Sequence, residues 1–252
     1  MPSHTFVNVY NQILEKGKVT RGWLGVNMNT LPFTPAMARF FGVRQGSGVL
    51  ITGLSGEKGE ASNSGPAARA GIKAEDVIVE FDGRKVMSVQ DLRLAVANTL
   101  PGRRVKVKAV RQGKEQEFEV NIAERTLESQ EAEKNAFSFE EKPEEIKPEI
   151  GLQFDNIPQR MEEEASITGG ALVLSVKPGS LAEEAGLVGQ DQGGADIIVE
   201  ANGKKISVAQ DLLNVVKGLK SGEAVVLKFI RLQRGAGNRM TPATFYTSIT
   251  KP

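Results

Sequence analysis

The sequence predicts a mainly β chain of the α+β class, built as two copies of one small module. Residues 76–86, DVIVEFDGRKV, recur as residues 196–206, DIIVEANGKKI, and the Gln-Asp-Leu that follows recurs with them. Every matched position lies 120 residues after its counterpart, an offset that is too long for a solenoid repeat and suits a small folded domain. Short strands, a small helix, a tight turn and a longer helix also follow in the same order in both copies. We therefore expect two domains of one fold.

The composition is that of two self-sufficient domains. The chain has 252 residues, of which 40% are hydrophobic and 25% charged, so each half can bury a core without a metal or a disulfide. The absence of cysteine excludes disulfides and thiolate zinc sites, and we expect no cofactor. A net charge of +1 predicts no nucleic-acid partner. No long apolar run and no signal peptide follow Met1, so we expect a soluble chain, a mature form or an excised fragment.

The regions outside the two copies differ in character. Residues 3–16 predict a short amphipathic helix that Gly17 ends, and the second copy has no such helix before it. Residues 126–148 contain seven glutamates and two prolines with few apolar residues, which favours a solvated linker over a docking tail. The expected division is a helix within residues 1–18, a domain over 19–125, a linker over 126–148 and a second domain over 149–252.

Each copy begins with the same three elements. A short strand with one buried face is followed by an apolar strand and by a small helix that ends at a glycine, where a left-handed backbone is least costly. We expect them at residues 24–28, 48–51 and 66–70 in the first copy, before Gly71, and at residues 150–154, 171–176 and 180–185 in the second, before Gly186.

Each copy also ends alike. Asp82-Gly83 and Asn202-Gly203 predict tight hairpin turns. A longer helix then opens with a capping box, which we expect to begin at Ser88 in the first copy and at Ser207 in the second. A terminal hairpin closes the unit, over 105–110 with 116–122 and over 224–231 with 243–249. Asp76 and Asp196 occupy homologous positions in separate domains, so we expect them to hydrogen-bond within turns and not to form a catalytic pair.

The order of these motifs carries a family resemblance. With x-Φ-Gly-Φ first, Ala-Gly-Φ-x-x-x-Asp-Φ-Ile in the middle and Asn-Gly-x-x-Φ before a capped helix, each copy resembles a PDZ domain of the bacterial type. The resemblance implies two small, partly open antiparallel β-barrels or sandwiches of five to six strands with two helices. Residues 2–26 are similar to the junction at which the trypsin-like domain of HtrA/Deg-family proteases meets the first PDZ domain. Residues 1–18 would then be the last helix of a protease domain that is otherwise missing.

The sequence also departs from the family pattern at local loops. Glu75 and Ala195 stand where the family usually has a glycine before the aspartate. The second copy has additional residues over 189–194, and the first has a polar excursion over 55–64.

The resemblance implies a peptide-binding site in each copy. A PDZ domain adds an extended peptide to a sheet edge beside a helix, and backbone amides of a glycine-containing loop hold the peptide's carboxylate. The implied residues are Arg21, Trp23, Leu24, Gly25, Val26, Met28, Leu92, Ala95 and Val96 in the first copy, and Lys147, Glu149, Ile150, Gly151, Leu152, Leu212, Val215 and Val216 in the second.

Several of these residues have an alternative role. Leu92 and Val96 also suit the ordinary core of a helix packed on a sheet. Arg21 and Lys147 either support the carboxylate or are plain solvated cations, and Trp23, the only tryptophan, is either a groove wall or an interface residue. Glu149 places a negative charge beside the second loop, so we expect the first copy to bind more tightly.

The sequence contains no residue pattern that indicates a catalytic site. His4 is the only histidine, so a Ser-His-Asp triad would depend on the start of the chain. The common hydrolase, metalloprotease and nucleotide-binding motifs are missing from the sequence. We therefore expect no peptidase activity and no metal site in the chain as given.

Two functions from different classes remain. In the first, the chain is the substrate-recruiting and regulatory region of an envelope serine endopeptidase. It would bind exposed C-termini or apolar segments of misfolded proteins in the periplasm, with its own protease domain as a partner in a homo-oligomer, trimeric or larger. In the second, it is a free-standing PDZ adaptor, or the PDZ pair of another membrane-associated system such as an intramembrane metalloprotease. The helix expected at residues 3–16 favours the first.

Overall fold

The structure is a computed structural model that describes most of the two expected domains. The described residues are 20–44, 46–56, 64–124, 150–158, 161–162, 167–192, 194–234 and 240–251. Their contacts divide the chain into two compact units, residues 1–29 with 41–131 (unit 1) and residues 30–40 with 132–252 (unit 2). The helix expected at 3–16 and the linker expected at 126–148 lie outside the described residues.

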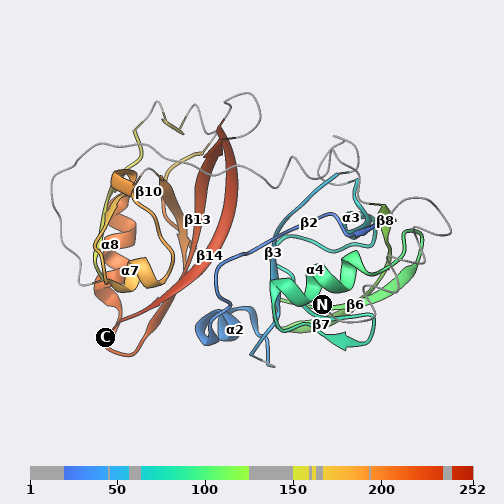
Figure 1. Ribbon diagram of the computed structural model, residues 1–252. Coiled ribbons are helices and arrows are strands. Elements are labelled where there is room, and N and C mark those ends of the chain that lie inside the picture. Colours follow the sequence, from blue (N-terminus) through green and yellow to red (C-terminus); the bar gives the residue numbers. More distant parts are fainter. Residues whose placement is uncertain are drawn as a thin grey trace. The chain divides into compact units, whose positions relative to one another are not determined.

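Unit 1 is built around one antiparallel sheet (Figure 1). Its strands are ordered β2-β3-β4-β6-β7, with β5 paired to β4, and β1 pairs separately with β8. Helix α2 (Pro35–Phe41) follows β2 in the sequence, and its residues up to Phe40 group with unit 2. The other elements are β1 (Gly22–Trp23), β2 (Val26–Met28), β3 (Val49–Leu54), α3 (Pro66–Arg69), β4 (Val77–Phe81), β5 (Arg84–Lys85), α4 (Val89–Ala97), β6 (Arg104–Arg111), β7 (Lys114–Asn121) and β8 (Ala123–Glu124).

Unit 2 repeats this plan. Its antiparallel sheet has the order β14-β13-β11-β10-β9, with β12 paired to β11. The elements are β9 (Leu152–Asn156), β10 (Ala171–Val176), α7 (Leu181–Glu184), the 3-10 helix η1 (Gln190–Gln192), β11 (Asp196–Ala201), β12 (Lys204–Lys205), α8 (Ala209–Gly218), β13 (Ala224–Arg234) and β14 (Met240–Thr250). Both sheets are open among the described strands, each with two edge strands, so neither closes into a barrel.

Most predicted elements are confirmed. The short helices α3 and α7 end before Gly71 and Gly186, whose φ values of 89° and 76° are the left-handed conformation expected there. The Asp82-Gly83 and Asn202-Gly203 turns have positive φ at all four residues, and each joins a strand of the repeat to its short partner. Both terminal hairpins form and run longer than predicted.

Three predicted details are wrong. The first strand of unit 1 does not include Leu24 and Gly25, because Gly25 adopts φ 75° and breaks the extended chain before β2. In unit 2, Gly151 has φ 76° for the same reason, and β9 begins after it and continues to Asn156. The N-cap of α8 is Val208, one residue beyond the predicted Ser207.

Each unit has its own apolar core between its helices and one face of the sheet. In unit 1 the core includes Phe81 from β4 and Val107 from β6, and Leu92 of α4 packs into it. In unit 2 the corresponding core joins Phe229 of β13 to Leu212 of α8. The core residues of α4 and α8 recur at helical spacing, as the sequence predicted.

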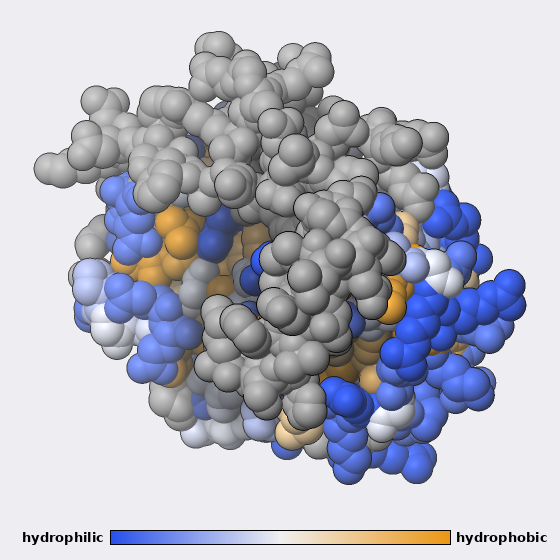
Figure 2. Space-filling model, turned by 45° about the vertical axis from the view of Figure 1, so that its right-hand side comes forward, coloured by the Kyte–Doolittle hydropathy of each residue, from blue (hydrophilic) through white to orange (hydrophobic). Residues whose placement is uncertain are grey.

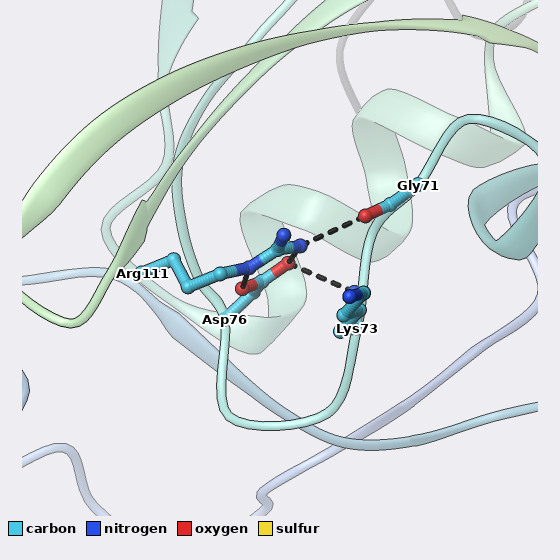
Figure 3. Close-up of polar contacts among 4 residues, drawn as sticks. All are labelled: Gly71, Lys73, Asp76 and Arg111. Carbon is cyan, nitrogen blue, oxygen red and sulfur yellow. Dashed lines mark hydrogen bonds and ion pairs between the residues drawn. The ribbon is translucent and has the colours of Figure 1, made fainter.

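A buried ion pair recurs at the same place in both units. In unit 1 the Arg111 guanidinium donates to both carboxylate oxygens of Asp76, at 2.6 and 2.7 Å, and also to the carbonyl of Gly71 at 2.8 Å (Figure 3). The Asp76 side chain is fully buried and also accepts from the Lys73 amide, so the expected turn hydrogen bond is confirmed. Through these hydrogen bonds, Arg111 of β6 links the loop after α3 to the start of β4.

Unit 2 has the equivalent pair between Arg231 and Asp196. Arg231 donates to both carboxylate oxygens of Asp196 and to the carbonyl of Gly186, and the Val188 amide donates to the same carboxylate at 2.8 Å. Burial raises the pKa of Asp196, and the hydrogen bonds and charge of Arg231 oppose that effect. The guanidinium also lies over the ring of Phe229, 5.4 Å from its centre.

Candidate functional site

The glycine loop before β2 is the best-defined candidate site in unit 1. The carbonyl of Leu24 accepts from the Ala67 amide at 2.9 Å, and the carbonyl of Gly25 accepts from the Ser55 amide at 3.0 Å. In a trans peptide the N–H points opposite to the C=O of the same peptide unit. The amides of Gly25 and Val26 therefore point away from α3 and β3. Two consecutive amides on one side of a left-handed residue form an anion-binding geometry.

Unit 2 builds the same loop from different residues. The carbonyl of Ile150 accepts from the Ala182 amide at 3.3 Å, and the carbonyl of Gly151 accepts from the Lys177 amide at 2.9 Å. The amides of Gly151 and Leu152 consequently point away from α7 and the end of β10. Because two different sequences hold the loop in the same way, the arrangement belongs to the repeated fold and not to one copy.

Both loop positions require glycine. Gly25 and Gly151 have φ values of 75° and 76°, which side-chain-bearing residues rarely adopt. A Cβ on Gly25 would lie 3.0 Å from the carbonyl oxygen of Ser55. A Cβ on Gly151 would lie only 2.3 Å from the Cβ of Ser180. A side chain at either position would push the loop and its two amides out of place.

The loop lies at a sheet edge and beside a helix in each unit. Strands β2 and β9 directly follow the loops, and among the described strands each is the last of its sheet. In unit 2, α8 contacts β9 and β10; in unit 1, α4 contacts β1, just before the loop. That contact is close, since a Cβ on Gly22 would lie 2.3 Å from the carbonyl oxygen of Val96. An edge strand with a helix beside it offers backbone groups and an apolar wall to an extended chain.

The predicted site residues divide into a buried set and a partly exposed set. The buried set consists of Leu24, Leu92 and Val96 in unit 1 and of Ile150, Leu152, Leu212 and Val216 in unit 2. All of these belong to the cores, so ordinary packing also accounts for their burial. The partly exposed set, Val26, Met28, Ala95 and Val215, packs against those cores and keeps part of its apolar surface exposed.

Two of the predicted side chains on the loop flank of unit 1 lie apart from these apolar residues. The indole of Trp23 lies on the α3 side of the loop, near the positions that a Cβ on Gly25 or Gly65 would occupy. It therefore supports the loop from behind, opposite to the outward amides. Arg21 is exposed, whereas Lys147 and Glu149 lie outside the described residues.

Exposed apolar side chains stand at the start of the helix beside each loop strand. Met87, which precedes the N-cap of α4, is 60% exposed, and Val208, the N-cap of α8, is 45% exposed. Leu94 of α4 is 48% exposed. Figure 2 shows hydrophobic residues next to hydrophilic ones where the described surface is visible on the face drawn.

The described residues hold no group of three or more His, Asp or Glu side chains that could bind a metal ion. Within the same part of the chain, no helix has the length and apolar character needed to cross a membrane.

Three features of the site region escaped the sequence reasoning. The partners Arg111 and Arg231 had a signal, since each follows its aspartate by 35 residues in both copies. Gly22 had a weak signal, as a glycine beside an expected strand. Asn156 had none, because its side-chain hydrogen bond with the Ala209 amide joins residues that are 53 positions apart.

A glycine loop with two outward amides, followed by a strand that ends its sheet among the described residues and with a helix nearby, is typical of small α+β modules that recognise extended chains. Residues 47–122 and 148–241 match the model of the PDZ domain family. The chain belongs to the PDZ domain family and carries two of its domains.

The chain is also similar to longer curated proteins. It is 33% identical over 230 residues to a probable periplasmic serine endoprotease, DegP-like, of Chlamydia muridarum. The matched region covers 90% of this chain and 41% of that protein. It is 30% identical to the protein of the same description from Bartonella henselae, over 92% of this chain and 42% of that protein. The chain thus spans less than half the length of these relatives and corresponds to their PDZ region.

Solved structures show a looser overall likeness. The HtrA-type protease AlgW with a decapeptide is 29% identical, with a TM-score of 0.40 over 50% of this chain and 36% of that one. The HtrA3 PDZ domain bound to a phage-derived ligand is 22% identical, with a TM-score of 0.33 over 42% of this chain and 88% of that one. With TM-scores this low, these likenesses add nothing to the family assignment.

Proposed function

We propose that this chain is the tandem PDZ region of an HtrA/Deg-type serine endopeptidase and that each unit binds the C-terminus of an extended peptide. The observation that carries the proposal is the pair of outward amides at Gly25 and Val26, repeated at Gly151 and Leu152, beside a strand that ends its sheet among the described residues. These amides suit a carboxylate, and the edge strand suits the backbone that precedes it. The partly exposed Val26, Met28 and Ala95 favour apolar side chains near that C-terminus.

The proposal extends to the whole protein. Residues 1–18 would be the last helix of the protease domain, residues 19–125 and 149–252 the two PDZ domains and residues 126–148 the linker between them. In that protein the PDZ region recruits exposed C-termini and unfolded segments, helps to set the activity and assembles with the protease domain in a homo-oligomer of three or more chains. The names of the relatives support a periplasmic location.

A pair of peptides tests the carboxylate interaction. The intact chain is titrated by calorimetry with a peptide ending in valine, once with a free carboxylate and once with a C-terminal amide. We expect the amide to bind at least tenfold more weakly, because charge-assisted hydrogen bonds to backbone amides contribute roughly 1.5–3 kcal/mol. Equal affinity for the two peptides would contradict the carboxylate role of the loops.

The same titration compares the two units. We expect unit 1 to bind the free-acid peptide more tightly, by roughly fivefold, since Glu149 repels a carboxylate by about 1 kcal/mol at about 4 Å in water. Each unit is measured in the intact chain with the loop glycine of the other replaced by alanine. Glu149→Gln should then strengthen binding by unit 2 and leave unit 1 unchanged. A stronger unit 2 that does not respond to Glu149→Gln would show that this charge is not the cause.

A further inference from the structure

Helix α8 begins at a residue that cannot cap it. The first amides of a helix lack intrahelical partners and usually bond to the side chain of the N-cap residue. In unit 1, Ser88 fills this role for α4, since its Oγ accepts from the Asp91 amide at 3.2 Å. The N-cap of α8 is Val208, which has no side-chain acceptor. The Asp211 amide, which corresponds to that of Asp91, donates instead to the Val208 carbonyl at 3.0 Å, and the first helical amide, that of Ala209, has a partner on another element.

That partner comes from the edge strand. The side-chain Oδ1 of Asn156 accepts from the Ala209 amide at 2.8 Å. Asn156 is the last residue of β9, and by strand alternation it shares a face with Leu152 and Phe154. Leu152 belongs to the core against which α8 packs, and Phe154 lies against the same core. The Asn156 hydrogen bond therefore joins the two elements between which the proposed peptide site of unit 2 lies.

The Asn156 hydrogen bond lies at the end of that site away from the carboxylate loop. Gly151 precedes the first residue of β9 and Asn156 is its last, so the loop and the hydrogen bond stand at opposite ends of the strand. A second link holds the same end, because the Gly170 amide donates to the Ser207 carbonyl at 3.0 Å. A peptide added to β9 places one residue opposite each residue of the strand. It would meet the Asn156 side chain after about four residues.

We propose that Asn156 restricts unit 2 to short C-terminal tails of about four residues, whereas unit 1, whose helix is capped by its own Ser88, accepts longer tails. This inference rests on the proposed function and assigns Asn156 as a residue that determines specificity. The two units would then differ in the length of C-terminal tail that they bind, and not only in the C-terminal side chain that they prefer.

The test is a series of nested peptides on the intact chain. Acetylated peptides of four, six, eight and ten residues share one C-terminal sequence that ends in valine. Unit 1 is measured in the Gly151→Ala chain and unit 2 in the Gly25→Ala chain. We expect the affinity of unit 1 to rise roughly fivefold from four to eight residues, since each added cross-strand pair contributes modestly. The affinity of unit 2 should change less than about twofold.

Two further variants separate the length limit from the helix cap. Asn156→Ala is combined with Val208→Ser, because a serine there can accept from the Asp211 amide as Ser88 does from the Asp91 amide, and this side-chain cap offsets part of the helix stability that is lost with the Asn156 bond to Ala209. In this double variant, unit 2 should gain affinity with length as unit 1 does. Val208→Ser alone keeps Asn156 and should remain insensitive to length. Circular dichroism and the melting temperature check that both variants stay folded.

The outcomes distinguish this inference from the proposed function. If no peptide binds the unmodified chain, both are overturned. If peptides bind and unit 2 gains from length with Asn156 in place, or remains insensitive in the double variant, only the role of Asn156 is overturned.

Discussion

Replacement of Arg111 by methionine is expected to lower the free energy of unfolding of unit 1 by about 3–5 kcal/mol. The Asp76 carboxylate is fully buried, so the variant leaves a charge without its main partner in the interior. The carbonyl of Gly71 also loses its hydrogen bond, and Phe118 loses the guanidinium that lies 5.3 Å from its ring centre. Urea unfolding followed by tryptophan fluorescence measures the effect, because Trp23 is the only tryptophan and lies in unit 1.

A surface ion pair of unit 1 provides the matched control. Arg103 donates to Asp82 at 2.8 Å, but the two side chains are 56% and 37% exposed. Arg103→Met should therefore cost less than about 1 kcal/mol. Replacement of both members of the buried pair, Asp76→Leu with Arg111→Met, should recover much of the lost stability, because no buried charge remains. An Arg111→Met chain as stable as the Arg103→Met chain would show that the buried pair does not hold the unit together.

The sequence was sufficient to predict the fold because local signals, such as turn and helix-end residues, define the elements and recur in both copies. The Asp82-Gly83 and Asn202-Gly203 turns need the positive φ that Asp, Asn and Gly adopt, and the glycines after α3 and α7 end those helices for the same reason. Local rules placed one cap wrongly: they favoured the serine at 207, whereas the structure begins α8 one residue later. There, the Val208 carbonyl takes the Asp211 amide, and the distant Asn156 side chain takes the Ala209 amide.

The candidate site was predictable as a list of residues but not as a set of roles. Leu92 and Val96 have the spacing of both a core and a binding wall, and only packing shows that they are buried. The sequence pattern alone could not decide between the two possible roles of Trp23. Its position on the α3 side of the loop depends on the packing of its ring near Gly25 and Gly65, which are far apart in the sequence. Asn156 acts through a long-range contact that no local pattern signals.

The second large effect is expected at the loop glycines. Gly25→Ala and Gly151→Ala should each weaken the binding of a free-carboxylate peptide to its own unit by at least tenfold. A left-handed alanine costs about 1–2 kcal/mol, and the new methyl group would crowd the Ser55 carbonyl or the Ser180 side chain. Relief of that contact moves the two amides, and loss of one charge-assisted hydrogen bond alone is worth roughly 1.5–3 kcal/mol. Calorimetry with the valine-terminated peptide measures the loss.

Two variants show whether the loss comes from the loop itself. Gly83 has the same φ, 76°, but a Cβ there would meet nothing within 4 Å, so Gly83→Ala carries the backbone strain without crowding and should bind peptide normally. In unit 2 the crowding atom is the Cβ of Ser180, which Ser180→Gly removes at a small cost in helix capping. Gly151→Ala with Ser180→Gly should therefore regain part of the affinity that Gly151→Ala loses. If Gly83→Ala weakens binding as much as Gly25→Ala does, the strain acts on the whole unit and the amides of the loop are not the carboxylate site.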